Sequence, residues 1–168
     1  MLQISQRPVA RRQLRESLCL EEQAVIAIAV GTYRETEGVL DFLKAAGEMP
    51  DVIFLWYGGT SGRRVKRRIR RAMKEAPENV CFMGEIEADE LREGCLGADI
   101  YLNLSYEETE ETALREVLYC GLPVIARDIP GCDFRLKDTK DMSRVQNVED
   151  AVACIRRRVQ ERTLKEIS

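Results

Sequence analysis

The amino-acid sequence predicts a doubly wound α/β domain, in which a parallel, Rossmann-like sheet carries helices on both faces. Two observations lead to this fold. Short apolar runs alternate along the chain with amphipathic segments of helical period. The runs are apolar along their whole length, which is typical of parallel strands that are buried on both faces. Helical segments between them supply the crossovers that parallel strands need.

The predicted elements follow one another as strand, helix, strand, helix. The first strand is expected at 24–30 (AVIAIAV), closed by Gly31, and the first helix at 38–46, where apolar residues recur at helical spacing. The glycine at 121 marks the end of a later helix. The remaining strands are expected at 51–57, 79–83, 99–104 and 123–126, and the remaining helices within 63–74 and at 89–96, 111–119 and 149–163.

Length and composition limit the type of protein. A chain of 168 residues, 45% of them hydrophobic, is long enough for one domain with a buried core and too short for a second domain of normal size. No apolar run approaches the roughly 18 to 20 residues of a membrane span, and the N-terminal residues lack the apolar stretch of a signal peptide. We therefore expect a cytoplasmic protein.

Histidine is absent from the chain, and this excludes several kinds of chemistry. A mechanism that uses an imidazole base would need a histidine from another chain. The six cysteines lie far apart and form no CxxC pair, so neither a zinc site nor a disulfide framework is expected. Any chemistry must rest on carboxylates, backbone dipoles or cations.

Charge is unevenly distributed along the chain. Residues 63–74 contain eight cations and no acid, whereas residues 85–116 contain eleven acids and two arginines. In the basic stretch Val65, Ile69 and either Ala72 or Met73 have helical spacing, so one face can pack while the cations face outward. A solvated helix face is the simplest interpretation. An anionic lipid surface is the alternative partner, while RNA is disfavoured because no aromatic residue interleaves with the cations.

Ligands of such sheets bind beyond the carboxyl ends of the strands, where the turns lead into helices. The loops at 31–38, 58–62, 84–88 and 105–112 are the candidates, although their glycines are also compatible with simple tight turns. There is neither a G-x-G-x-x-G fingerprint nor a Walker lysine. Glu108 and Glu116 are separated by seven residues around a predicted helix start, a spacing that can turn both toward a hydroxyl-rich ligand. Acids at a helix start are also favoured by the macrodipole alone.

The stretch 79–130 combines NVCFMGEI, ADIYLNLSYEETE, Glu116 and CGLPVIARDIP. This combination resembles the C-terminal, donor-binding half of retaining glycosyltransferases of the B-type, two-Rossmann fold. The resemblance continues more weakly from about residue 14 to the C-terminus. Within that superfamily, SYEETE and ARDIP are most similar to bacterial diacylglycerol glucosyltransferases, which make membrane glycolipids.

The resemblance implies roles for individual residues. Glu108, the implied catalytic position, approaches the hydroxyls of the donor sugar, and Glu116 binds the ribose of the nucleotide. Backbone amides near Thr112 meet the diphosphate, Gly31 lets the donor approach the backbone, and Glu85 with its neighbour frames the base. The implied donor-binding positions are Gly31, Thr32, Arg34, Glu37, Glu85, Ile86, Thr109, Glu111, Thr112, Ala113 and Glu116. The implied substrate is a UDP-hexose, with no metal and no other cofactor.

The chain departs from the family pattern at three of these positions. Thr32 and Glu37 replace an arginine and a lysine that neutralise the leaving diphosphate, and Glu111 stands where a small residue is usual. Arg34 is the only cation near the first strand that can substitute for the missing pair. These changes predict weaker binding of a diphosphate.

The resemblance also sets the expected organisation. Residues 1–22 correspond to a linker-like segment, and 23–168 to one nucleotide-sugar-binding domain. The acceptor would bind to an N-terminal domain or a partner subunit, without which the chain is expected to be inactive, so whether it is an enzyme by itself stays open. The alternative is a noncatalytic Rossmann-like module that binds a protein partner or, peripherally, an anionic membrane. No nucleic acid is expected as a partner.

Overall fold

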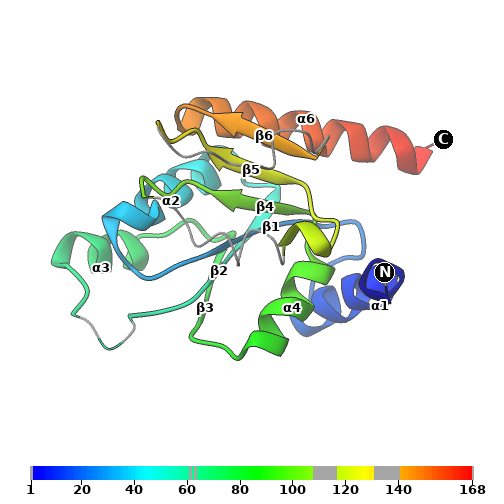
Figure 1. Cartoon of the computed structure of the whole chain (residues 1–168), viewed down its shortest axis with the longest axis horizontal. Coiled ribbons are helices and arrows are strands. Elements are labelled where there is room, and N and C mark those ends of the chain that lie inside the picture. Colours follow the sequence, from blue (N-terminus) through cyan, green and yellow to red (C-terminus); the bar gives the residue numbers. More distant parts are fainter. Residues whose placement is uncertain (1, 61, 63, 108–116, 131–140, 168) are drawn as a thin grey trace.

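The computed structural model describes residues 2–60, 62, 64–107, 117–130 and 141–167. Its centre is a six-stranded sheet in the order β3-β2-β1-β4-β5-β6, in which all neighbouring strands are parallel (Figure 1). The predicted Rossmann-like fold is thereby confirmed, because the strand order reverses beside β1 as in a doubly wound sheet. The strands are β1 (Val25–Val30), β2 (Val52–Tyr57), β3 (Val80–Gly84), β4 (Ile100–Asn103), β5 (Val124–Arg127) and β6 (Met142–Val145). The α-helices are α1 (Leu2–Ser17), α2 (Val39–Glu48), α3 (Arg67–Lys74), α4 (Ala88–Gly97) and α6 (Val148–Ile167), and η1 (Glu35–Glu37) is a short 3-10 helix.

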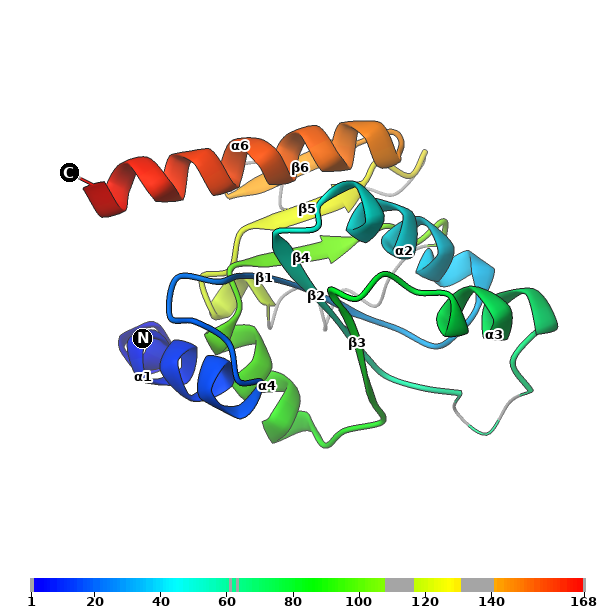
Figure 2. The same cartoon turned by 180° about the vertical axis from the view of Figure 1, so that it is seen from behind.

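Helices cover both faces of the sheet, which explains why its strands are apolar throughout. In β1, Ile26 and Ile28 point to the face that is covered by α1 and α4, and Ala27 and Ala29 point to the face that is covered by α2 and α6. Figure 2, seen from behind, shows α6 running along one side of the sheet and α1 lying next to α4 on the other. Each face therefore has its own buried apolar cluster.

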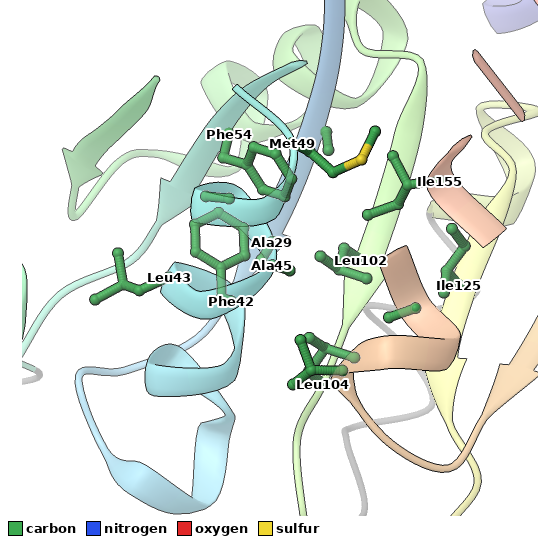
Figure 3. Close-up of a cluster of buried hydrophobic side chains, with 14 of the residues drawn as sticks. Ala29, Phe42, Leu43, Ala45, Met49, Phe54, Leu102, Leu104, Ile125 and Ile155 are labelled. Atoms are coloured by element: carbon green, nitrogen blue, oxygen red, sulfur yellow. The ribbon is translucent and has the colours of Figure 1, made fainter. Parts of the chain in front are cut away.

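The cluster under α2 is built around aromatic rings. Phe42 packs edge-on against Phe54 and Trp56, with ring centroids 5.4 Å and 5.1 Å apart. Small residues stand beside these rings, and Figure 3 shows Ala29 and Ala45 between the helix and the strands. Large rings beside alanines allow α2 to approach the sheet closely. This packing fixes the start of α2, and with it the loop that follows β1.

Most predicted elements form where the sequence indicates, within a few residues. The prediction missed β6, whose residues MSRV contain no continuous apolar run. In the described sheet β6 is an edge strand that pairs with β5, so it needs no fully apolar sequence. The predicted helix 111–119 lies partly outside the described residues, and its last residues, 117–119, are helical.

The N-terminal segment that we expected to be linker-like contains α1. This helix has a proline at position 8 and weak amphipathicity, so its sequence gives little sign of a helix. The side chain of Arg15, only 2% exposed, fastens α1 to the domain. The Arg15 guanidinium donates hydrogen bonds to the backbone oxygens of Arg11, Ala24 and Gly97 and to the carboxylate of Asp99.

Among the described helices, none has the length and apolarity that a membrane span requires.

Candidate functional site

The loops that follow β1 and β4 meet at the carboxyl edge of the sheet. These two strands are neighbours at the point where the strand order reverses, which is where doubly wound sheets bind ligands. The backbone oxygen of Thr36 accepts hydrogen bonds from the backbone nitrogen of Tyr106 (2.8 Å) and from the hydroxyl of Ser105 (3.0 Å). Gly38 has a φ of 80°, and a Cβ there would lie 2.2 Å from the oxygen of Leu104. Only glycine allows this contact, so the sequence joins the two loops at a fixed distance.

Gly31 connects the first of these loops to the loop after β2. Its backbone nitrogen donates to the oxygen of Tyr57, and its oxygen accepts from the indole nitrogen of Trp56 (3.0 Å for each). Gly58, with a φ of 115°, approaches so closely that a Cβ would lie 2.1 Å from the Gly31 oxygen. The turn at Gly31 is therefore rigid on one side and faces Glu37 on the other.

Glu37 lies over Gly31 and is paired with Arg34. A Cβ on Gly31 would lie 3.0 Å from a carboxylate oxygen of Glu37. Arg34 donates to Glu37 (2.8 Å) and to the hydroxyl of Thr32 (3.1 Å), and it lies 3.6 Å from the carboxylate of Glu107. The hydrogen bond to Glu37 raises the pKa of Arg34. Arg34 thus lies beside two of the positions predicted to bind the donor, Thr32 and Glu37, and carboxylates already balance its charge.

The two residues expected to frame the base point in different directions. Glu85 packs against the β2 loop, where a Cβ on Gly59 would lie 2.6 Å from its side chain. Tyr33 donates its backbone N–H to the Gly59 oxygen, and burial, with a smaller effect from Glu85, raises the pKa of its hydroxyl. Ile86 instead lines a pocket of about 460 Å³ between α1, α4 and the end of β3. Of the pair, Glu85 is the one that lies near the β1 loop.

The described part of the candidate site stops before the glutamate pair. Glu107 is the last described residue after β4, and it stands beside the β1 loop. Val117, 3% exposed, is where the description resumes. The predicted residues Glu108, Thr109, Glu111, Thr112, Ala113 and Glu116 lie outside the described residues, so their roles stay predictions.

Arg127, at the end of β5, braces the β4 loop and was not among the predicted site residues. Its guanidinium lies 4.0 Å from the centre of the Tyr106 ring and donates to the oxygen of Leu104 (3.1 Å). It also forms an ion pair with Asp41 of α2, which accepts a hydrogen bond from the Tyr106 hydroxyl. That hydrogen bond is the largest of the effects that raise the pKa of Tyr106. The sequence contained a signal for this residue, since Arg127 belongs to the ARDIP motif.

A pocket of about 280 Å³ opens between the β1 and β2 loops. Its walls include Tyr33 and Ile69, and Glu107 from the β4 loop reaches it. The cations that line it are Arg34, Arg64 and Lys66. Glu35 lines the pocket as well, so three cations stand beside two carboxylates. A rim with charges of both signs over an apolar wall suits a polar ligand with an apolar or sugar portion.

Comparison with known proteins places this geometry in a family. The sequence matches the family "Glycosyl transferases group 1" over residues 10–166. It is 35% identical over 116 residues to the processive diacylglycerol alpha-glucosyltransferase of Acholeplasma laidlawii, an alignment that covers 69% of this chain and 35% of that enzyme. The chain therefore spans about a third of the length of this curated relative.

The fold is shared with solved structures at lower identity. HepE from Anabaena in complex with UDP-glucose matches with a TM-score of 0.75 and 14% identity, over 93% of this chain and 44% of that chain. The C-terminal domain of LpcC, a glycosyl transferase group 1 family protein from Francisella tularensis, matches with a TM-score of 0.71 and 17% identity, over 92% of this chain and 84% of that domain. Because the family match covers nearly all of its length, the chain belongs to the glycosyl transferases of group 1, and its fold is that of their C-terminal domain.

Proposed function

We propose that this chain is the nucleotide-sugar-binding domain of a retaining glycosyltransferase and that its donor is a UDP-hexose. The observation that carries the proposal is the contact between the β1 and β4 loops, where Thr36 accepts two hydrogen bonds at the switch point of the sheet. A chain of this family with these two loops in contact has the frame for a donor. The complex of a structural neighbour with UDP-glucose supports the choice of ligand.

The proposed roles follow from the chemistry of the ligand. Glu108 accepts hydrogen bonds from the sugar hydroxyls and Glu116 from the ribose, because a carboxylate accepts paired O–H donors well. Backbone amides near Thr112 and Ala113 bind the diphosphate. Glu85 contributes to the edge of the base site, next to Tyr33.

Arg34 is the proposed cation for the diphosphate, and Glu37 competes with the ligand for it. In the free protein, the carboxylate of Glu37 accepts the charged hydrogen bond that a phosphate oxygen would take. When the donor binds, a phosphate oxygen must replace the Glu37 carboxylate as the partner of Arg34, and the negative charge of Glu37 stays near the phosphates. The proposal therefore predicts donor binding in the millimolar range, weaker than a site with two uncommitted cations would give.

Titration calorimetry with UDP and UDP-glucose tests this function. The unmodified chain should bind both ligands, and Glu116→Ala should remove the binding because it deletes the ribose contact. Glu161→Ala, which removes an exposed carboxylate on α6, is the matched control and should bind as the unmodified chain does. Equal binding by all three proteins, or no heat at millimolar ligand, would refute the assignment.

Sugar transfer itself is proposed to need an acceptor-binding domain or partner subunit that these residues do not supply. The chain spans only about a third of the curated relative, and the reaction in the B-type fold takes place between two domains. Incubated alone with UDP-glucose and vesicles that contain diacylglycerol, the chain should produce no glucolipid. Glucolipid formation by the purified chain would contradict this part of the proposal.

A second candidate function, a noncatalytic module that binds an anionic membrane, is favoured by the surface of α3. Ile69 is fully buried, while Arg68 and Arg71 are 75% and 78% exposed. The exposed cations of the helix thus form one surface above a packed apolar face. The cations are Arg67, Arg68, Arg70, Arg71 and Lys74.

Vesicle flotation distinguishes this function from donor binding. If α3 binds membranes, a variant with Arg67, Arg68 and Arg71 changed to Gln should lose most of its binding to vesicles that contain phosphatidylglycerol. A control with the same charge change on α6, at Arg156, Arg157 and Lys165, should keep it. Equal loss in both variants would mean that net charge, and not the α3 surface, determines binding.

A further inference from the structure

Four arginines gather at the amino-terminal edge of the sheet, opposite the donor-binding loops. Arg11, Arg12 and Arg15 come from α1 and Arg162 comes from α6. Figure 1 shows α1 and the C-terminal end of α6 on the same side of the molecule. Together with Pro8, Glu22 and Gln23, the four arginines line a pocket of about 480 Å³, which we call the arginine pocket.

One carboxylate holds three of these arginines. Asp99, just before β4, forms ion pairs with Arg11, with Arg15 at 2.7 Å and with Arg162 at 3.0 Å. The side chains of Arg11, Arg15 and Arg162 are 27%, 2% and 18% exposed, and that of Asp99 is 7% exposed. Water therefore screens the charges of this cluster little. A single carboxylate balances one of the three positive charges.

The rest of the arginine pocket does not balance the other two. Arg12 adds a fourth positive charge to its lining, and Glu22 adds a second negative charge. Four arginines against Asp99 and Glu22 leave a net charge of +2 among these residues. Burial lowers the pKa of Arg15, and Arg11 and Arg162 lower it further while Asp99 opposes them. Unbalanced positive charge is therefore concentrated around a hollow that a small anion can enter.

Arg15 has a structural role, whereas Arg12 and, in part, Arg11 have the exposure that a ligand requires. Each of the three nitrogens of the Arg15 guanidinium already donates to backbone oxygens or to Asp99. Arg12 is exposed and Arg11 is partly exposed, and both line the pocket. None of the ion pairs in the described part of the chain involves Arg12. Its guanidinium can thus bind an anion without breaking the Asp99 cluster.

We propose that the arginine pocket binds a phosphate group, held between α1 and α6 and separate from the donor site. A phosphate monoester carries a charge of about −1.5 to −2 near neutral pH, which matches the excess charge of the pocket better than a carboxylate does. The planar guanidinium also fits phosphate oxygens in paired hydrogen bonds. A ligand bound here joins the first and last helices of the domain and so stabilises its folded state.

Thermal unfolding in inorganic phosphate tests the proposal, with chloride used to hold the ionic strength constant. Phosphate should raise the unfolding temperature of the unmodified chain, and Arg12→Gln should weaken the apparent phosphate affinity at least about tenfold. Arg156→Gln removes an exposed arginine of α6 outside the pocket and should leave the response intact. Absence of stabilisation, or an equal response in the two variants, would overturn the proposal.

Two further measurements locate the site and identify the source of the phosphate. In a backbone amide spectrum, phosphate should change the chemical shifts of the Arg12 and Gln23 amides. Changes confined to the loop after β1 and to α3 would overturn the proposal. Flotation with vesicles that contain phosphatidic acid separates the sources. Binding that Arg12→Gln abolishes identifies a lipid headgroup, whereas a response to soluble phosphate without Arg12-dependent flotation identifies a free phosphorylated ligand.

Discussion

Glu37 is the described residue that most directly sets the charge of the proposed donor site. It stands where the resemblance implies a lysine, it covers Gly31, and it accepts the hydrogen bond of Arg34, the one cation in residues 31–38. The sequence predicted the loss of positive charge at positions 32 and 37. It did not predict that Arg34 would be bound to Glu37, because a side-chain pairing three residues apart in an irregular loop depends on the backbone path.

Changing Glu37 to Lys should increase UDP affinity by about tenfold or more. The change removes an anion, releases Arg34 and adds a second cation, so that two cations can form charge-assisted hydrogen bonds with the diphosphate. Combining it with Glu111→Gly should raise the affinity further. Glu37→Gln, which removes only the negative charge, should give an intermediate affinity in calorimetry. If Glu37→Lys binds UDP no better than the unmodified chain, charge at this position does not limit binding.

Tyr57 should make the stability of the fold sensitive to alkaline pH. Burial raises its pKa from 10.0 to about 12. Above about pH 10 the unfolded chain loses this proton while the folded chain keeps it, so the free energy of unfolding falls as the pH rises toward about 12. Below that range the contribution of Tyr57 is complete and does not change with pH.

Urea denaturation of Tyr57→Phe isolates this effect. The variant should lose stability less steeply above about pH 10 than the unmodified chain, by up to about 1.4 kcal/mol per pH unit. Other tyrosines and the lysines titrate equally in both proteins, so the difference belongs to Tyr57. Parallel pH curves for the two proteins would contradict the burial of its hydroxyl.

At the scale of elements, apolar periodicity predicted the helices and strands that pack mainly through apolar side chains. The central strands and α2 have clear apolar patterns, a glycine marks one end of β1, β2 and α2, and these elements form close to the expected residues. By contrast, α1 packs through a few apolar side chains, among them Ala10 and Leu14, together with the hydrogen bonds of Arg15, and β6 joins the sheet through its backbone pairing with β5. The weak amphipathicity of α1 and the lack of a continuous apolar run in β6 leave no clear pattern, so both elements escaped prediction.

The attachment of α1 should depend strongly on Arg15. Arg15→Met keeps the volume of the side chain but removes its hydrogen bonds to the oxygens of Ala24 and Gly97 and its ion pair with Asp99. Loss of one partner from a buried ion pair costs about 3 to 5 kcal/mol, and Arg11 and Arg162 should keep the cost near the lower end. Arg12→Met, one turn away and exposed, should change the unfolding free energy by less than about 0.5 kcal/mol. Similar stability of both variants in urea would show that the contacts of Arg15 contribute little to the stability of the fold.

At the scale of the whole molecule, the two edges of the sheet have different proposed tasks. The carboxyl edge joins the β1 and β4 loops through Thr36 and carries the proposed donor site. The amino-terminal edge carries the arginine pocket between α1 and α6. Family membership and strand order are established for this chain, whereas the donor, the acceptor and the transfer of sugar are proposals, since the chain covers 35% of its curated relative.

The most direct test of the central proposal is a map of backbone amide chemical shifts during titration with UDP-glucose. The largest shifts should fall in residues 31–38 and 104–107 and continue into 108–116, while the amides around the arginine pocket should change little. No shift at millimolar UDP-glucose, or shifts confined to the amino-terminal edge, would contradict a donor site at the junction of β1 and β4.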